Sequence, residues 1–356
     1  AFLLVRMSSA SEPFFLPHQD PKPAGQKWLL IENLSDEFDG SVLDRSKWQD
    51  DPVGNGWNWY GRAPGLFRAA NVQLKDGKMC VTVSKLDAPV VRAGKTFTHQ
   101  GAIVRSLHPG QPGWYFECRM KANATIMSST FWLMPKPGHG KRLELDIQEC
   151  VGLTTEKTEP WARKWDRIFH SNLIQHKNRF TPEKVQLQKS VPTETKNWER
   201  CYVYGAWWKS PWEVRFYLDG KYVYSIEPKV AWDVPAFIQM AIETYDWNPV
   251  PEDGGLVETG TWQQRTTQYD WVRTWELADE SVEPTEASPS EESSGVRRDG
   301  AGALSGVASL MADRRRLEDH LKGKVMRHEQ IHIRPVCADI CDSGLRGSGD
   351  RGRTRY

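Results

Sequence analysis

Arg142-Leu-Glu-Leu-Asp-Ile-Gln-Glu-Cys150 is a strand-like stretch in which aliphatic and acidic residues alternate. Side chains on a β-strand point alternately to its two faces, so the aliphatic residues share one face while Glu144 and Asp146 share the other. This alternation predicts a strand with one face in a hydrophobic core and one acidic face turned away from it. The stretch therefore indicates both a sheet and a site.

Glu149 interrupts the alternation. Strict counting places its carboxylate on the aliphatic face, where the loss of hydration would cost several kcal/mol. A β-bulge after Asp146 adds one residue and returns Glu149 to the face of Glu144. We therefore expect three acids on one face, with an aspartate between two glutamates. Two carboxyl groups about 5–5.5 Å apart are the arrangement used by retaining glycosidases, and crowded negative charge favours protonation of one of them.

Short runs of alternating or β-branched residues, separated by turns, fill the chain from about Trp28 to Leu277. Asp76-Gly77 and Asp219-Gly220-Lys221 each separate two such runs, and Asp-Gly pairs are typical of β-hairpin turns. No segment of about 12 residues in this region has a helical period. The sequence predicts an all-β fold of two packed sheets.

The composition divides the chain into three parts. All 17 tryptophans lie between Trp28 and Trp275, and the only aromatic residue after Trp275 is Tyr356. We expect an extended, proline-containing lead-in (1–27), a folded domain (28–278) and a charged, disordered tail (279–356). His328-Glu-Gln-Ile-His332 in the tail matches the H-E-x-x-H zinc signature, but no core surrounds it to fix a third ligand, so we assign no metal site there.

Charge and hydropathy exclude several classes of function. A net charge of +1 over 356 residues provides no field that would recruit nucleic acid or an anionic membrane. The mean hydropathy is −0.62, and no apolar run approaches the ~18 residues of a membrane span. The first residues, Ala1-Phe-Leu-Leu-Val-Arg-Met7, contain too short an apolar run for the signal-peptide core of about 7–15 residues. We expect neither a nucleic-acid nor a membrane partner, and no signal peptide is visible.

Glu144-Leu-Asp-Ile-Gln-Glu149 resembles the E-x-D-x-x-E signature of glycoside hydrolase family 16 in its bulged-strand form. The similarity covers about residues 28–278 and is greatest to the β-agarase and β-porphyranase branch, which cuts red-algal galactans. It implies a jelly-roll sandwich with an open concave substrate cleft. It also implies retaining endo-hydrolysis of β-1,4 linkages by double displacement, and a secreted or periplasmic enzyme. The other segments that carry it are Trp57-Asn-Trp-Tyr-Gly-Arg-Ala-Pro64, Asn71-Val-Gln-Leu-Lys-Asp-Gly-Lys78, Gly101-Ala-Ile-Val-Arg105, Phe131-Trp-Leu-Met134 and Glu243-Thr-Tyr-Asp-Trp247.

The resemblance assigns roles to individual residues. It implies Glu144 as the nucleophile, Asp146 as its assisting acid and Glu149 as the general acid/base. Further positions line the substrate cleft in that branch, and they correspond here to Trp59, Arg62, Trp132, Glu243 and Trp247.

Three more residues are candidate substrate contacts because of where they lie in the sequence. His170 and Asn172 share one face of a predicted strand, which suits polar contacts to the sugar on the leaving-group side. Arg142 lies two residues before Glu144, on the same predicted face. Guanidinium groups offer a two-pronged fork for sulfate, so Arg62 and Arg142 favour porphyran over neutral agarose as the substrate.

Several alternatives remain at this point. A κ-carrageenase-like or furcellaran-cleaving enzyme has the same signature, and a non-catalytic carbohydrate-binding protein has the same sandwich. The intact acid trio favours an enzyme, because a lectin gains nothing from crowding carboxylates. We expect a monomer that acts on a polysaccharide and requires no cofactor. The family resemblance also implies a structural calcium ion near Asp36, Asp39 and Asp270.

Overall fold

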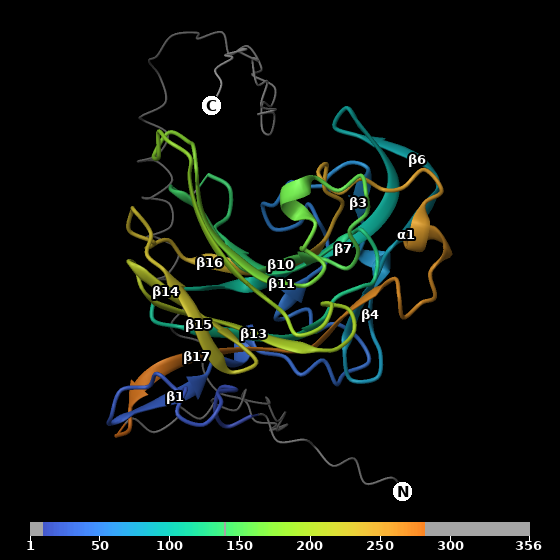
Figure 1. Cartoon of the computed structure of the whole chain (residues 1–356). Helices are drawn as coiled ribbons and strands as arrows, with labels where there is room; N and C mark the ends of the chain where they lie inside the picture. The colour runs from blue at the N-terminus through green and yellow to red at the C-terminus, as the bar shows by residue number, and fades with distance from the viewer. Residues whose placement is uncertain (1–9, 139, 282–356) are drawn as a thin grey trace, which may run out of the picture. The chain divides into compact units, whose positions relative to one another are not determined.

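A computed structural model describes residues 10–138 and 140–281, which form two β-sheets packed against each other (Figure 1). Neighbouring strands run antiparallel, except for one short parallel pair at the edge of one sheet. This arrangement confirms the all-β sandwich that the sequence predicts. The H-E-x-x-H motif and the predicted tail from residue 282 onward lie outside the described residues.

The eight-stranded sheet combines two groups of hairpin-connected strands, β13-β14-β15 and β4-β5, with the strands β8 and β17 between them and β1 beside β17. Its order is β15-β14-β13-β8-β17-β5-β4, and β1 pairs with β17. The bounds are β1 (Gln26–Leu30), β4 (Val72–Leu74), β5 (Met79–Thr82), β8 (Tyr115–Lys121), β13 (Tyr202–Ser210), β14 (Glu213–Leu218), β15 (Lys221–Ile226) and β17 (Thr266–Asp279).

The nine-stranded sheet carries the acidic strand near its centre. Its order is β12-β11-β10-β9-β16-β7-β2, with β3 and β6 also paired to β7. The bounds are β2 (Trp48–Gln49), β3 (Gly65–Phe67), β6 (Ser84–Arg92), β7 (Lys95–Gly110), β9 (Ser128–Met134), β10 (Arg142–Val151), β11 (Ile168–His176), β12 (Val185–Pro192) and β16 (Ala236–Ile242). Helical structure within the described residues is limited to η1 (Glu32–Leu34), η2 (Ala69–Asn71), η3 (Pro160–Ala162) and α1 (Gly255–Thr259).

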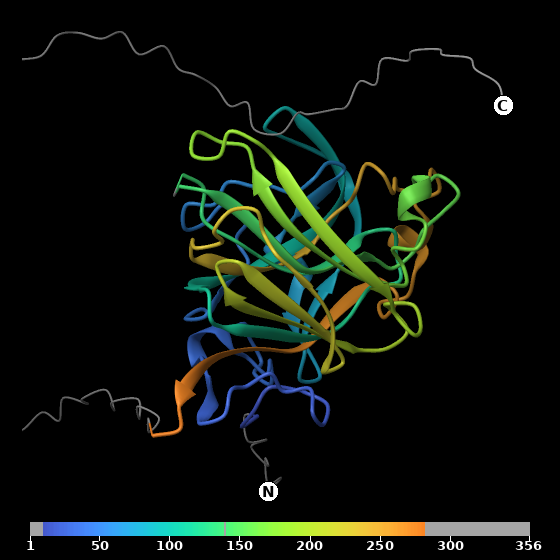
Figure 2. The ribbon, with the colours of Figure 1, turned by 60° about the vertical axis from the view of Figure 1, so that its left-hand side comes forward.

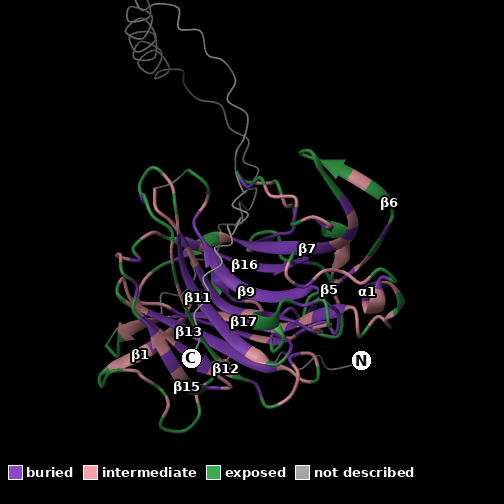
Figure 3. Ribbon diagram, turned by 45° about the horizontal axis from the view of Figure 1, so that its top comes forward, coloured by how far each residue is buried: buried purple, intermediate pink, exposed green. Residues whose placement is uncertain are grey.

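One hydrophobic core fills the space between the two sheets. Strand alternation sends Leu143, Leu145 and Ile147 of β10 into this core, where each is at most 1 % exposed. Figure 3 shows that most strands of both sheets are buried along their length. The opposite side of β10 therefore belongs to a second surface, called here the outer face of the nine-stranded sheet.

The Asp-Gly turns form as expected. Asp76 and Gly77 have φ angles of 53° and 68°, in the left-handed region that a tight hairpin between β4 and β5 requires. Asp219 and Gly220 have φ angles of 48° and 74° and join β14 to β15 in the same way. Short polar side chains and glycine tolerate this backbone geometry, which explains why the sequence signals both turns.

The lead-in packs more closely on the sandwich than its prolines suggest. The Phe15 ring lies 4.8 Å from that of Tyr115 and 5.1 Å from that of Tyr217, on the outside of the eight-stranded sheet. The backbone N–H of Phe14 donates to the buried Glu117 carboxylate at 3.0 Å. Aromatic residues between the prolines therefore fasten this segment, a role that the sequence analysis did not assign to it.

Among the described residues, no helix combines the length and the apolar composition that crossing a membrane requires.

Gly101 provides a test of how tightly the nine-stranded sheet is packed. A Cβ atom at this position would lie 2.1 Å from the carbonyl oxygen of Ile242 on β16. We expect Gly101→Ala to lower the free energy of unfolding by about 1–3 kcal/mol, as measured by urea denaturation. Gly40→Ala is the control, because its nearest neighbour would be 3.5 Å away. Equal denaturation midpoints for the two variants would contradict the close approach of β7 and β16.

Candidate active site

The register between β10 and β9 shifts between Asp146 and Gln148. Asp146 pairs with Trp132, and after the shift Glu149 pairs with Thr130. Trp132 and Thr130 are two residues apart on β9 and thus share a face, so their partners Asp146 and Glu149 share it too. The structure confirms the bulge, which brings Glu149 to the outer face beside the other two acids.

Glu149 is held by two hydrogen-bond donors. The Tyr245 hydroxyl donates to Oε1 at 2.8 Å, and the Asn172 amide donates to Oε2 at 3.0 Å. Burial raises the pKa of Glu149 to about 7, the charges of Glu144 and Glu243 act in the same direction, and the Tyr245 hydrogen bond opposes them. A carboxyl group with this pKa can both give and take a proton near neutral pH.

Asp146 is 5 % exposed and lies between the two glutamates on the strand. Burial raises its pKa well above the ordinary value, and the negative charges of Glu144 and Glu149 raise it further. The Asn172 amide donates to Asp146 Oδ2 at 3.0 Å, while the Gln186 amide on β12 donates to Asn172 Oδ1 at 3.1 Å. Gln186 thus turns the NH₂ group of Asn172 toward both acids.

Glu144 contacts a histidine that the sequence analysis did not single out. His176 Nε2 lies 2.8 Å from Glu144 Oε2. An ionised carboxylate can only accept, so the imidazole N–H is the donor when Glu144 is charged. His176 pairs with Arg142 across β10 and β11, and it shares the outer face with His170 and Asn172 by alternation. That spacing of six and four residues was the sequence signal for it.

Arg62 forms an ion pair beside the acids rather than standing free. Its Nε donates to Glu243 Oε2 at 2.9 Å, and its guanidinium carbon lies 5.2 Å from the centre of the Tyr245 ring. The Glu243 charge raises the pKa of Arg62. Burial raises the pKa of Glu243, which the Arg62 charge opposes. Arg62 and Glu243, both predicted substrate contacts, are therefore also each other's partners.

Trp59 and Trp132 belong to a second, smaller hydrophobic cluster on the outer face. Their ring centroids are 6.1 Å apart at an interplanar angle of 73°, and Trp59 also meets Phe67 at 4.9 Å. Trp132 is 7 % exposed, and it lies directly beside Asp146 in the strand pairing. This cluster separates the two tryptophans from the main core, with Trp132 next to Asp146 and Trp59 packed against Trp132.

His170 and Trp247 meet at a third group of aromatic residues. Trp165 lies 4.4 Å from the His170 ring and 4.8 Å from that of Trp247, and Trp247 is stacked on Tyr245 at 4.6 Å. His170 is 5 % exposed, and neither ring nitrogen has a hydrogen-bond partner among the described residues. Burial lowers its pKa to about 4, so the imidazole is neutral near pH 7.

The three residues suggested for calcium do not form a suitable site. The carboxylate of Asp270 already accepts from Lys78 at 2.6 Å and from Arg119. Asp36 accepts from the Trp48 indole at 2.9 Å and from the backbone N–H of Phe38 at 2.8 Å. Cationic partners on Asp270 leave little negative charge for a hard divalent cation, and the described residues contain no cluster of three or more His, Cys, Asp or Glu side chains that could hold a metal ion.

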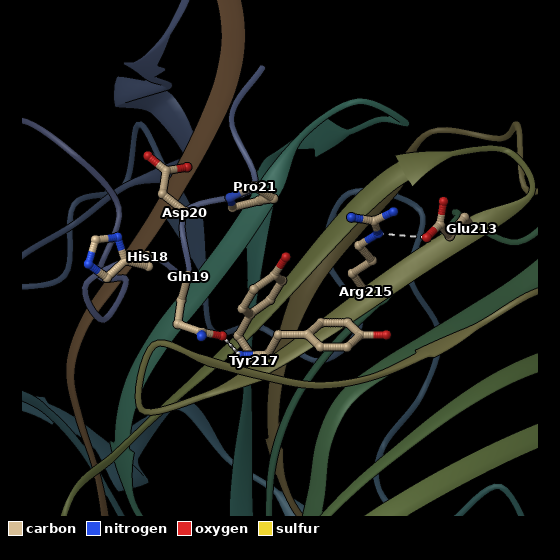
Figure 4. A pocket seen from close by; sticks show the side chains of 8 residues that line it. His18, Gln19, Asp20, Pro21, Glu213, Arg215 and Tyr217 are labelled. Carbon is tan, nitrogen blue, oxygen red and sulfur yellow. Dashed lines mark hydrogen bonds and ion pairs between the residues drawn. The ribbon is translucent and has the colours of Figure 1, made fainter. Parts of the chain in front are cut away.

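A shallow hollow of about 410 Å³ lies elsewhere, on the outside of the eight-stranded sheet (Figure 4). Two of its charged groups are paired with each other, since Arg215 Nε donates to Glu213 Oε1 at 2.6 Å. Gln19 Oε1 accepts from the backbone N–H of Tyr222 at 3.1 Å. This hollow belongs to the other sheet and holds none of the predicted site residues.

Comparison with known proteins gives a consistent result. The family model described as "Beta-porphyranase A-D, GH16 domain" matches residues 28–277. β-Porphyranase B of Zobellia galactanivorans is 43 % identical over 288 residues, which is 78 % of this chain and 94 % of that protein. β-Porphyranase B of Phocaeicola plebeius is 33 % identical over 72 % of this chain and 86 % of its own length.

Solved structures agree with the sequence relatives. The crystal structure of porphyranase B from Zobellia galactanivorans superposes with a TM-score of 0.70 at 43 % identity, covering 75 % of this chain and all of that one. The β-porphyranase BpGH16B of Bacteroides plebeius gives a TM-score of 0.62 at 30 % identity, with coverages of 76 % and 96 %.

The raised pKa of Glu149 predicts how stability depends on pH. Its folded pKa of about 7 exceeds the ~4.3 of an unfolded glutamate, so the folded chain binds more protons between these values. The wild-type free energy of unfolding should therefore fall, relative to Glu149→Gln, as pH rises from about 4 to 7. We expect the wild-type free energy of unfolding to fall by roughly 2–4 kcal/mol relative to that of the variant between pH 4 and pH 8, measured by urea denaturation.

The exposed residue Glu156, on the loop after β10, provides the control through Glu156→Gln. A Glu149→Gln difference from wild type that stays the same at pH 5 and pH 8 would show that Glu149 titrates normally.

Proposed function

The chain belongs to the β-porphyranase A–D group of glycoside hydrolase family 16, and on that premise we propose that it is a retaining endo-hydrolase of red-algal galactans. It cleaves β-1,4 linkages by double displacement, and porphyran is the preferred polymer. The observation that carries the proposal is the bulged strand β10, which holds Glu144, Asp146 and Glu149 on one face. The two β-porphyranases named above support red-algal galactans as the substrate class.

The first chemical step uses both glutamates. Glu149 gives its proton to the glycosidic oxygen as the bond from that oxygen to the anomeric carbon breaks, and Glu144 forms an ester with the same carbon. A pKa of about 7 supports the role of Glu149, because a useful fraction carries a proton near neutral pH. In the second step Glu149 takes a proton from water, and the resulting hydroxyl displaces Glu144 from the sugar.

Neighbouring donors give each glutamate oxygen a separate task. His176 donates to Glu144 Oε2, so Oε1 is the atom that attacks and Oε2 becomes the carbonyl oxygen of the ester. Tyr245 donates to Glu149 Oε1, which favours the ionised form needed as a base in the second step. Burial and the neighbouring charges raise the pKa of Asp146, which favours its protonated form and so reduces its repulsion toward the anionic Glu144. The chemistry uses these side chains alone.

A purely sugar-binding role fits the site less well. Placing Asp146 and Glu149 in a water-poor position costs free energy, and the nearby negative charges of Glu144 and Glu243 add to the cost of ionising them. Binding proteins can recognise sugars with neutral groups, whereas acid–base catalysis needs a carboxyl group with a shifted pKa. Catalysis therefore accounts for the free energy spent on burying these acids, whereas sugar binding alone does not.

Arg62 supports porphyran, whose sulfate esters are anionic. Its side chain is 47 % exposed although Nε is bound to Glu243. The terminal nitrogens of the guanidinium have no protein partner within the described part of the chain, which leaves a fork for a sulfate oxygen pair. Because the polymer is too large to enter a cell by diffusion, we also propose that the enzyme works outside the cytoplasm. We further propose that it acts as a monomer.

Substitution of the two glutamates tests the mechanism. Glu144→Gln should reduce hydrolysis of porphyran to near background, because the ester cannot form. Glu149→Gln should abolish cleavage of the polymer yet spare ester formation on an aryl glycoside whose leaving group needs no proton. Reducing-sugar release and the burst of aryl leaving group measure the two effects. More than about a tenth of the wild-type rate in Glu144→Gln, a loss below ~1.4 kcal/mol, would reject this nucleophile.

The stereochemistry gives an independent check of the same mechanism. Proton NMR of the earliest products should show the anomer that retains the configuration of the substrate. Early accumulation of the inverted anomer would rule out double displacement. A panel of agarose, porphyran, κ-carrageenan and laminarin identifies the polymer, and a faster rate on κ-carrageenan would favour the alternative within the family.

The sulfate preference is tested at Arg62. Arg62→Ala should lower kcat/KM on porphyran by roughly 10- to 100-fold, as expected for the loss of one charge-assisted contact of ~1.5–3 kcal/mol, and lower it much less on agarose. Because this change also unpairs Glu243, the double variant Arg62→Ala/Glu243→Gln is the matched control. Equal losses on both polymers, or full recovery in the double variant, would make Arg62 a structural partner of Glu243 only.

A further inference from the structure

A series of aromatic rings leads away from the acid/base residue. Tyr245, which is bonded to Glu149, is stacked on Trp247 with 4.6 Å between centroids and an interplanar angle of 17°. Trp247 in turn meets Trp161 at 5.2 Å. The series therefore begins at the reacting carboxyl group and ends at a ring that nothing above has given a role.

Trp161 is an exposed ring in a fixed position. It is 61 % exposed, and unlike an isolated surface ring it contacts two other tryptophans, Trp165 and Trp247. The short η3 turn that carries it is fastened by two backbone bonds of 2.9 Å, from Glu159 N–H to Trp247 O and from Ala162 N–H to Glu159 O. Trp165 supports it from one side, with ring centroids 5.7 Å apart.

The contacts of this turn show where it lies relative to the acids. Trp165 packs on His170 of β11, whereas Arg62 is bound to Glu243 just after β16. The turn therefore adjoins β11 through Trp165 and the segment after β16 through Trp247, and the series of rings that leads to it begins at Glu149, which protonates the leaving group in the proposed mechanism. In Figures 1 and 2 the light-green turn of η3 lies beside the orange segment that follows β16, at one end of these strands.

We propose that Trp161 is a stacking platform for a galactan sugar on the leaving-group side of the scissile bond. This inference rests on the proposed function and deepens it, because it adds a binding position beyond the residues that flank the broken bond. The C–H groups on one face of a galactose ring are apolar and cover an indole surface, which removes exposed apolar area from water. Its hydroxyl groups stay at the edge and remain hydrated.

Such a platform predicts a dependence on substrate length. A long galactan oligosaccharide reaches Trp161, whereas an aryl glycoside that carries sugars only on the other side of the broken bond does not. Trp161→Ala should therefore lower kcat/KM on the long oligosaccharide about tenfold, and by less than about twofold on the aryl glycoside. Trp161→Phe retains a ring and should recover part of the loss.

Trp212 provides a matched control on the same protein. It is 56 % exposed and precedes β14 of the eight-stranded sheet, away from the acids. Trp212→Ala removes a similar exposed indole and should leave both substrates unaffected. Thermal melts of all variants check that each has folded.

The outcomes separate this inference from the function beneath it. A lower kcat/KM on the long oligosaccharide alone, seen in Trp161→Ala and not in Trp212→Ala, supports the platform. Equal rates for wild type and Trp161→Ala on the long substrate, or equal losses on the long and aryl substrates, would overturn it while leaving the hydrolase intact. Failure of the unmodified protein to cleave any red-algal galactan would overturn the proposed function and the platform together.

Discussion

The extra residue in β10, between Asp146 and Gln148, is the constraint on which the site depends. Strand alternation alone satisfies the core up to Ile147 and the outer face up to Asp146. Beyond that point the core still requires Cys150, which is fully buried, while the outer face requires Glu149. Only a shift of one residue satisfies both demands on one continuous strand. The bulge thus lets one strand both fill the core and present Glu149 on the outer face.

Crowding of acids on that face determines much of what surrounds it. Asp146, Glu149 and Glu243 are each harder to ionise because water is largely excluded from them. The donors that compensate come from other strands or loops, including the Asn172 amide and the Arg62 guanidinium. Removing any donor therefore changes the protonation of its partner as well as its position.

Sequence reasoning reached the features that depend on neighbouring residues. The alternation around Glu144 predicted the acidic face, and the cost of burying Glu149 among aliphatic side chains predicted the bulge. It did not reach His176 as the partner of Glu144 or Tyr245 as the partner of Glu149, because these contacts join residues 32 and 96 positions apart. Such contacts depend on strand register and loop course, which a single sequence does not reveal.

Predictions that rested on the formal charge of a single residue had the same limit. Asp270 looked like a free oxygen ligand. The fold pairs it with Lys78, which directly precedes β5, and with Arg119 of β8. Arg62 looked like an unpaired cation, yet Glu243 lies beside it. A formal charge in a sequence therefore indicates a possible role only until its neighbours in space are known.

The docking of Phe14 and Phe15 sets a lower limit on how far the chain can be shortened from its beginning. Proteolytic trimming that stops before Phe14 leaves the aromatic cluster around Tyr115 closed and Glu117 bonded. Trimming that passes Phe15 exposes those rings to water and removes a donor from a buried carboxylate. Any maturation cleavage that preserves these contacts thus falls before Phe14.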